Sequence, residues 1–216
     1  MRYNTYIFDF DLTLADATKG IVLCYKTVLA NHGFPIPDDY IIKRTIGMTL
    51  TDSFAQFTGI TDMDILENLR NEYVKCADCI MTENTVIFDT VEPNLTMLKN
   101  SGAKCGIVTT KFAYRATQAL EKYGLTHLFD VVIGNEHVSE YKPSPQGLNL
   151  AITQLSACKE DVLYIGDTVI DAQTAANCGA DFAAVLTGLT TYEEFAKYNP
   201  KFILKDLNEL QNILQG

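Results

Sequence analysis

Short apolar runs alternate with amphipathic segments along most of the chain. Helical patterns lie between the runs, and glycines such as Gly102, Gly124 and Gly179 follow where a helix C-terminus favours a left-handed residue. Strict alternation of strand and helix predicts parallel strands with crossover helices, hence an α/β fold with a doubly wound, Rossmann-like parallel sheet. The runs typical of buried strands are residues 6–10, 105–109, 131–133, 161–165 and 181–186, and the helical patterns are residues 94–101, 113–123, 146–155 and 170–178.

One long segment breaks this alternation, and the end of the chain closes it. Between about residues 18 and 81 only helical patterns occur, and no repeat, low-complexity tract or long linker separates them from the rest. We therefore expect residues 16–84 to form an α-helical cap, inserted into a catalytic core made of residues 1–15 and 85–216. Residues 201–204 predict an edge strand, and residues 206–214 predict a closing helix.

The charge balance limits the classes of partner. Seventeen Lys and Arg against 27 Asp and Glu give a net charge of −10. This acidic balance argues against nucleic acid or an anionic membrane surface, because a Lys/Arg excess is needed to release counterions from phosphates. No run approaches the roughly 20 apolar residues of a membrane span, and the N-terminus leads directly into a strand. We expect a cytoplasmic protein that acts on small molecules, as a monomer or homodimer.

The six cysteines are scattered through apolar or helical stretches of a chain large enough to hold a core without disulfides. We interpret them as reduced and structural. Cys76 and Cys79 have metal or redox spacing, but no second pair and no nearby His completes a zinc site.

The polar residues with chemical potential follow successive predicted strands, where open parallel sheets bind ligands. Asp9 and Asp11 lie at the end of the first strand, two residues apart, so their carboxylates start on the same side. Two close carboxylates raise each other's pKa unless a cation lies between them, and Mg²⁺ is an oxygen-seeking ion that fits. A turn with solvated acids is the alternative for any single Asp in such a place.

Further candidates follow the later strands. The hydroxyl of Thr109 is followed by Thr110 and Lys111, and the proline-fixed loop at Lys142 can direct one ammonium inward. Asp167 follows another strand, and Asp171 lies four residues on, in the first turn of the next helix. Each of these alone fits a surface or turn residue, but their joint placement indicates a site.

Four motifs in this order resemble those of the haloacid dehalogenase superfamily of phosphatases. They are Asp9-Phe10-Asp11-Leu12-Thr13-Leu14, Val108-Thr109-Thr110-Lys111, Lys142-Pro143 and Gly166-Asp167-Thr168-x-x-Asp171. The branch is similar to phosphoglycolate phosphatase and beta-phosphoglucomutase, and the resemblance covers the whole chain, including a helical cap after the first motif. It implies a Rossmann-like core, a Mg²⁺ requirement and an aspartyl-phosphate intermediate.

The same resemblance implies a role for each catalytic position. Asp9 is expected to be the nucleophile, and Asp11 the general acid that later becomes the base. Thr109 is expected to hydrogen-bond the phosphoryl oxygens, with Thr110 beside it in substrate binding, and Lys142 to hold Asp9 and the phosphate charge.

A metal site is implied as well. Asp9, Asp167 and the main-chain carbonyl of Asp11 are expected to bind Mg²⁺, with Asp171 supporting the ion or its waters. These assignments agree with phosphoryl transfer, which needs an in-line nucleophile and neutralised equatorial oxygens.

The chain differs from the usual sequence of this branch in the first motif and in the fourth. In the first motif, Leu12 stands where glycine is commonest, and Ala17 stands where serine is usual. The side chain of Leu12 beside the catalytic turn is expected to alter the packing and to retain activity. The fourth motif also lacks the Glu-Asp start typical of beta-phosphoglucomutases, which favours hydrolysis.

Substrate selection is expected in the cap. Residues 44–49 resemble the cap loop that faces the active site in this branch, so Arg44 and Thr45 are candidate substrate contacts and Gly47 a point of close backbone approach. A solvated helix face remains the alternative for Arg44.

The predicted function is a Mg²⁺-dependent phosphatase for a small phosphorylated metabolite, like phosphoglycolate. An inorganic pyrophosphatase and a beta-phosphoglucomutase-type phosphotransferase are alternatives. A dehalogenase lacks a use for Asp11 and Asp167 together, a receiver domain acting as a regulatory phospho-acceptor has no use for the insertion, and a non-catalytic descendant is expected to have lost a motif residue.

Overall fold

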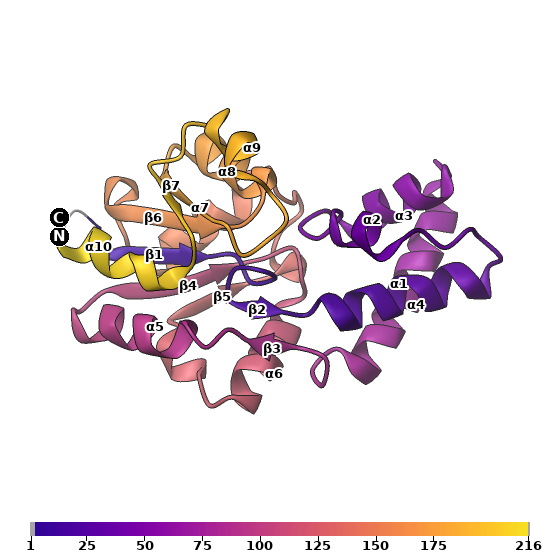
Figure 1. The fold of residues 1–216 in the computed structure, drawn as a ribbon, viewed down its shortest axis with the longest axis horizontal. Helices are drawn as coiled ribbons and strands as arrows, with labels where there is room; N and C mark the ends of the chain where they lie inside the picture. The colour runs from indigo at the N-terminus through magenta and orange to yellow at the C-terminus, as the bar shows by residue number, and fades with distance from the viewer. Residues whose placement is uncertain (1–2, 216) are drawn as a thin grey trace.

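The central sheet has six parallel strands in the order β5-β4-β1-β6-β7-β8 (Figure 1). The structure is a computed structural model that describes residues 3–215. The doubly wound, Rossmann-like α/β sheet predicted from the alternation is confirmed, with the last strand at the edge. The strands are β1 (Thr5–Phe8), β4 (Lys104–Val108), β5 (Val131–Ile133), β6 (Val162–Gly166), β7 (Asp181–Val185) and β8 (Phe202–Leu204).

Helices cover both faces of this sheet. Successive side chains of its strands point to opposite faces, and the side chains on both faces are largely apolar. On β1, Tyr6 and Phe8 pack with α5 (Val91–Asn100), α6 (Ala113–Lys122) and α10 (Leu210–Gln215). Ile7 packs on the other face, in the apolar cluster that holds α7 (Gln146–Gln154), α8 (Val169–Cys178) and α9 (Tyr192–Ala196). The sheet is therefore covered on both faces, and the C-terminal ends of its strands lie toward the remaining helices of the chain (Figure 1).

Four further helices form a separate bundle beyond the C-terminal ends of β1 and β4 (Figure 1). Its core has its own apolar cluster, in which the ring centroid of Tyr25 lies 5.1 Å from that of Phe54 and 4.6 Å from that of Tyr73. The bundle consists of α1 (Thr18–Asn31), α2 (Asp39–Lys43), α3 (Leu50–Thr58) and α4 (Met63–Ile80).

The chain enters and leaves the bundle through a two-stranded antiparallel ladder. Strand β2 (Ala15–Asp16) pairs with β3 (Val86–Ile87), so the two connections run together. Neither strand was predicted, because two residues show no periodicity. Helix α9, with five residues, was also not predicted, and neither were the short 3₁₀ turns at Thr126–Leu128, Asn135–His137 and Lys159–Asp161. The predicted closing helix at residues 206–214 is a 3₁₀ turn at Leu207–Glu209 followed by α10.

Candidate active site

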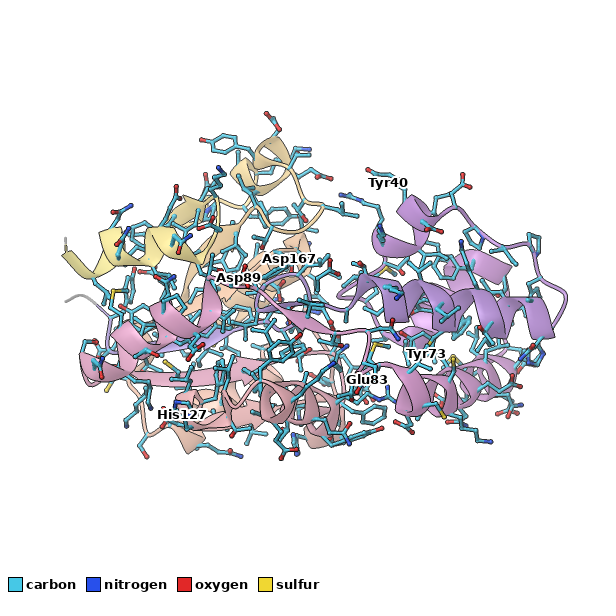
Figure 2. All side chains as sticks on the ribbon, turned by 60° about the horizontal axis from the view of Figure 1, so that its bottom comes forward. Tyr40, Tyr73, Glu83, Asp89, His127 and Asp167 are labelled. Atoms are coloured by element: carbon cyan, nitrogen blue, oxygen red, sulfur yellow. The ribbon has the colours of Figure 1, made fainter. Side chains whose placement is uncertain are left out.

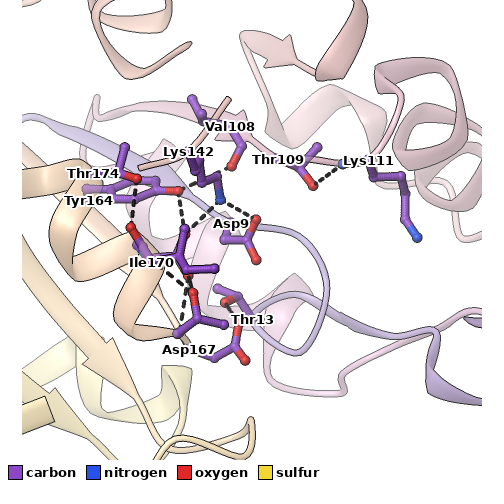
Figure 3. Close-up of polar contacts among 12 residues, drawn as sticks. Asp9, Thr13, Val108, Thr109, Lys111, Lys142, Tyr164, Asp167, Ile170 and Thr174 are labelled. Atoms are coloured by element: carbon purple, nitrogen blue, oxygen red, sulfur yellow. Dashed lines mark hydrogen bonds and ion pairs between the residues drawn. The ribbon is translucent and has the colours of Figure 1, made fainter. Parts of the chain in front are cut away.

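The C-terminal ends of β1, β4 and β6 bring the predicted polar residues together. Since β1 lies between β4 and β6, Asp9, Thr109 and Asp167 leave neighbouring strands at one edge of the sheet (Figure 3). This edge faces the helical bundle (Figure 1).

Three carboxylates form a buried cluster at this edge. Asp9 is 4% exposed, and Asp167 and Asp171 are each 1% exposed. One oxygen of each lies within 4.8 Å of the others. The ammonium of Lys142 donates hydrogen bonds to Asp9 Oδ1 and to Asp171 Oδ1, both at 2.7 Å (Figure 3). A single lysine thus joins the end of β1 to the start of α8.

The charges of this cluster do not balance. Burial raises the pKa of Asp9 to about 7, against the opposing effect of the Lys142 ammonium. Burial and the negative charges of Asp9 and Asp171 raise the pKa of Asp167 well above its usual range. Burial alone lowers the pKa of Lys142, but the carboxylates of Asp171 and Asp9 overcome this and raise it, so this lysine stays charged. Three acids therefore share one resident cation.

A divalent cation fits this arrangement. Three buried carboxylates and one ammonium leave an excess of two negative charges, which a hard, oxygen-binding dication neutralises. The oxygen-only donors of Asp9 and Asp167 suit such an ion, and the raised pKa of Asp167 shows how strongly its ionised form needs a positive neighbour.

Asp171 is held more completely than its neighbours. Oδ1 accepts from Lys142 and, at 2.9 Å, from the hydroxyl of Tyr164, while Oδ2 accepts from the backbone N–H of Thr168 at 3.1 Å and its hydroxyl at 2.6 Å. Thr168 in turn caps α8 by accepting from the backbone N–H of Asp171 at 3.2 Å. With two donors on each oxygen, the carboxylate is filled by the protein itself.

Asp167 has a different environment. Its Oδ1 accepts from the hydroxyl of Thr13 at 3.1 Å, a residue that is fully buried. A Cβ at Gly188 would lie 2.0 Å from Asp167 Oδ2, so any larger residue there would displace this carboxylate or the loop after β7.

Asp11 lies apart from the cluster, at a cavity between the sheet edge and the bundle. Lys111 Nζ lies 3.0 Å from Asp11 Oδ1, and both side chains are largely buried. The direction of approach does not make a hydrogen bond, and within residues 3–215 this buried oxygen accepts none. This oxygen is ion-paired with one ammonium but accepts no hydrogen bond, so it has lone pairs that a further donor at the cavity can fill.

Thr109 and Thr110 directly follow β4, and backbone hydrogen bonds hold Thr109 in place. The N–H of Thr109 donates to the carbonyl of Ile133 at 3.0 Å, and its hydroxyl accepts from the N–H of Lys111 at 3.1 Å. Thr109 is buried, and Thr110 lines the cavity next to Asp11.

The three cap residues expected to contact substrate lie in different environments. Thr45 and Gly47 line the same cavity as Asp11, but the Thr45 hydroxyl donates to the carbonyl of Ile42 at 2.8 Å. Gly47 has φ +97°, and a Cβ there would lie 3.2 Å from Thr168 Cγ2, so the loop rests closely on the start of α8. Arg44 lies outside this cavity and pairs with Glu194 of α9.

Several residues of the site were not among the predicted ones. Thr13 continues the two-residue spacing of Asp9 and Asp11, which is a signal that the sequence carries. The sequence carries no such signal for Tyr164 and Glu194. Their contacts with Asp171 and Arg44 form only when the chain folds.

Leu12, where the branch resembled in sequence commonly has glycine, adopts φ +60°. A non-glycine residue rarely holds this conformation, which the surrounding turn enforces: its N–H donates to the carbonyl of Ala15 at 2.7 Å. Its side chain is largely buried beside a second cavity, which Asp167 also lines.

Comparison with known proteins places this site in a family. The haloacid dehalogenase-like hydrolase family matches residues 6–185. Pyrophosphatase PpaX of Bacillus cereus is 32% identical over 221 residues, covering 100% of this chain and 98% of that protein. A protein of Dickeya dadantii named "Probable phosphatase IndB" is 29% identical over 207 residues, which cover 94% of this chain and 90% of that protein.

The solved structures agree. A haloacid dehalogenase-like hydrolase from Bacteroides fragilis is 48% identical, with a TM-score of 0.94 over 96% of this chain and 99% of that one. The chain belongs to the haloacid dehalogenase-like hydrolase family, and its relatives show it to be a phosphatase. A search of the helices in the described part of the chain finds none with the length and hydrophobicity needed to span a bilayer.

Proposed function

We propose that the protein is a Mg²⁺-dependent phosphatase that hydrolyses a small phosphorylated metabolite, like phosphoglycolate, through an aspartyl-phosphate on Asp9. The observation that supports this best is the asymmetry of the Asp9 carboxylate. Lys142 holds Oδ1 at 2.7 Å, whereas no protein group within residues 3–215 hydrogen-bonds Oδ2. One oxygen is anchored and the other is left for attack, as nucleophilic catalysis requires.

The reaction divides into two displacements. In the first, Asp9 Oδ2 forms a bond to phosphorus while the bond from phosphorus to the leaving oxygen breaks, and the protonated Asp11 gives its proton to that oxygen. In the second, Asp11 takes a proton from water as the water oxygen attacks phosphorus, which releases phosphate and restores Asp9. Asp11 Oδ1 supports this role, because it lies at the cavity and accepts no hydrogen bond within residues 3–215 beyond its ion pair with Lys111, so a leaving group or water can bind it.

The phosphoryl oxygens need donors beside this nucleophile. Thr109 follows β4, the neighbour of the strand that ends before Asp9, and its hydroxyl oxygen accepts from Lys111 N–H. Within residues 3–215 this hydroxyl donates to no protein group, which leaves its hydrogen for a phosphoryl oxygen. Lys142 supplies a fixed positive charge at Asp9 itself.

The metal ligands in this proposal are Asp9, Asp167 and the main-chain carbonyl of Asp11. When bound, Mg²⁺ neutralises charge on the phosphoryl oxygens. Asp171 acts differently from a ligand: its oxygens are filled by Lys142, Tyr164 and Thr168, so it serves to position Lys142.

Residues 16–84 act as a cap in this proposal, which excludes bulk water during transfer while residues 1–15 and 85–216 carry the chemistry. The separate apolar core of the bundle supports such a division. A cytoplasmic location, where small phosphorylated metabolites occur, belongs to the same proposal.

Inorganic pyrophosphate is a second candidate substrate. The relatives named pyrophosphatase PpaX favour it, at 32% identity over the whole of this chain for the one from Bacillus cereus.

The test is phosphate release from 2-phosphoglycolate, pyrophosphate and beta-glucose 1-phosphate, with Mg²⁺ or with EDTA. We expect metal-dependent release that is lost in Asp9→Asn, whose fold circular dichroism checks. Release that continues in a folded Asp9→Asn protein would contradict the nucleophile. Conversion of beta-glucose 1-phosphate into its 6-phosphate without phosphate release would indicate a mutase instead.

A further inference from the structure

The cavity beside Asp11 is lined by charged, polar and aromatic residues from both the core and the helical bundle. It measures about 90 Å³ and lies between the sheet edge and the helical bundle. Figure 2 shows Tyr73 within the bundle and Asp167 at the end of the core that faces it. Asp11, Thr110 and Lys111 line the cavity from the core, and Thr45, Arg70 and Tyr73 line it from the bundle.

Three cations reach this cavity, and two of them have close ion-pair contacts with acids. Lys111 lies 3.0 Å from Asp11. Arg115 donates to Asp78 Oδ1 at 2.6 and 3.0 Å and to the carbonyl of Val74 at 2.7 Å, and it is buried. A ligand could bind the Lys111 ammonium or the Arg115 guanidinium only by breaking one of these close contacts.

The third cation, Arg70, is held only loosely. Within residues 3–215 its hydrogen bonds come from Nη1 alone, to Glu67 Oε2 at 3.3 Å and to Asn71 Oδ1 at 3.4 Å. Both are long for charge-assisted bonds, and in the part of the chain that the structure describes no acceptor meets its Nε or Nη2. The side chain is 24% exposed, so its donors have lost much of their water without gaining a full set of protein partners.

An aromatic ring nevertheless fixes the place of this guanidinium. Arg70 Cζ lies 5.6 Å from the ring centroid of Phe112, and Arg115 Cζ lies 5.4 Å from the same centroid. Phe112 directly follows Lys111 in the loop after β4. A contact with a ring face orients a guanidinium while it leaves the N–H groups at its edge available. Arg70 is therefore positioned at the cavity with unused donors.

We propose that Arg70 binds a negatively charged group on the leaving group of the substrate, which rests on the proposed phosphatase function. The substrate class is a small phosphate ester or anhydride whose leaving group carries its own oxyanion. A carboxylate and a second phosphate share this chemistry, since both present two oxygens to a guanidinium.

The experiment compares three substrates that differ at the leaving group. 2-Phosphoglycolate carries a carboxylate, pyrophosphate carries a phosphate, and 2-hydroxyethyl phosphate has a neutral hydroxymethyl group where phosphoglycolate has the carboxylate. The wild type, Arg70→Met and Arg70→Lys are measured with each. Lys75→Met is the matched control, because it removes a positive charge from an exposed position of the same helix.

We expect Arg70→Met to lower kcat/KM about 10- to 100-fold on the preferred anionic substrate, mainly through KM. On 2-hydroxyethyl phosphate it should change kcat/KM less than about twofold, Arg70→Lys should lie between, and Lys75→Met should match the wild type. Whether phosphoglycolate or pyrophosphate suffers the larger loss identifies the oxyanion.

Equal losses on all three substrates, or no loss on any, would overturn the role of Arg70 while leaving the phosphatase function intact. Absence of phosphate release by the wild type from every substrate would overturn both. Urea unfolding of Arg70→Met shows whether an equal loss of kcat/KM on all three substrates comes from a lower stability. If the variant is as stable as the wild type, an equal loss means that Arg70 supports turnover of every substrate and does not select the leaving group.

Discussion

Arg44 and Glu194 form an ion pair that joins the helical bundle to the core. At the end of α2, Arg44 Nη2 donates to Glu194 Oε1 at 2.8 Å, and Nη1 donates to the carbonyl of Leu189 at 2.9 Å. The hydrogen bond from Arg44, with one from the Thr191 backbone, lowers the pKa of Glu194 to about 2. Leu189 directly follows Gly188, which lies against Asp167, so the pair connects the cap loop to the enclosure of that carboxylate.

The first prediction concerns this pair. Arg44→Ala and Glu194→Ala should each lower kcat/KM severalfold, because the loop around Asp167 loses its tie to the bundle. The double variant should lose less than the sum, with a coupling energy of about 0.5 kcal/mol that falls as salt is raised, since both side chains are about one-third exposed.

A second ion pair provides the control for that cycle. Lys26 and Asp39 pair within the bundle and make no link to the core. Their double-mutant cycle should show no coupling in kcat/KM. Additive effects for Arg44 and Glu194, or equal coupling in both cycles, would contradict the prediction.

The second prediction concerns pH and metal. In the metal-free protein Asp9 has a pKa of about 7, and the unfolded value is about 4. Between these values the folded protein binds more protons than the unfolded one, so the free energy of unfolding should fall as pH rises. Asp167, also raised, acts in the same direction.

Mg²⁺ binds the ionised carboxylates, so it should raise Tm more at about pH 8 than at about pH 5. Differential scanning calorimetry with and without saturating Mg²⁺ measures this, and Asp9→Asn should reduce the difference between the two pH values. A Mg²⁺-induced shift that is the same at both would argue against these ligands.

The third prediction concerns the hydroxyl that orients Asp167. Thr13→Val removes the donor at 3.1 Å without changing the size of the side chain, and it should weaken Mg²⁺ binding about tenfold. Isothermal titration calorimetry measures the affinity. Thr174→Val is the matched control, since that buried hydroxyl donates to the carbonyl of Ile170 within α8. Equal affinities in the two variants would show that Thr13 plays no part in holding the metal.

The fourth prediction concerns the support of Lys142. The Tyr164 hydroxyl donates to Asp171, and Lys142 Nζ lies 5.5 Å from the centroid of the Tyr164 ring. Tyr164→Phe removes only the hydroxyl, so kcat should fall about tenfold with KM nearly unchanged, and the free energy of unfolding should fall by about 1 kcal/mol. Tyr164→Leu removes the ring as well and should lower kcat further. An unchanged kcat in Tyr164→Phe would show that Asp171 positions Lys142 without the hydrogen bond from Tyr164.

The sequence by itself determined the alternation of strands and helices, because burial on both faces of a parallel sheet requires continuous apolar runs. It also placed Asp9, Thr109 and Asp167 at strand ends, since strand direction and chain order suffice to bring them to one edge. The helical insertion was visible as the segment without strands, and the structure places four helices there.

Only the tertiary structure decided which side chains meet across long separations. Lys142 reaches both Asp9 and Asp171, Arg44 pairs with Glu194, and Arg70 lies over Phe112. Local periodicity carries no information about these pairs, because each depends on how the bundle and the loops pack onto the sheet. Within residues 3–215, the same packing leaves Asp11 Oδ1 without a hydrogen bond, although Lys111 lies beside it, and leaves Arg70 with unused donors. These incompletely satisfied groups are the ones that a substrate can bind.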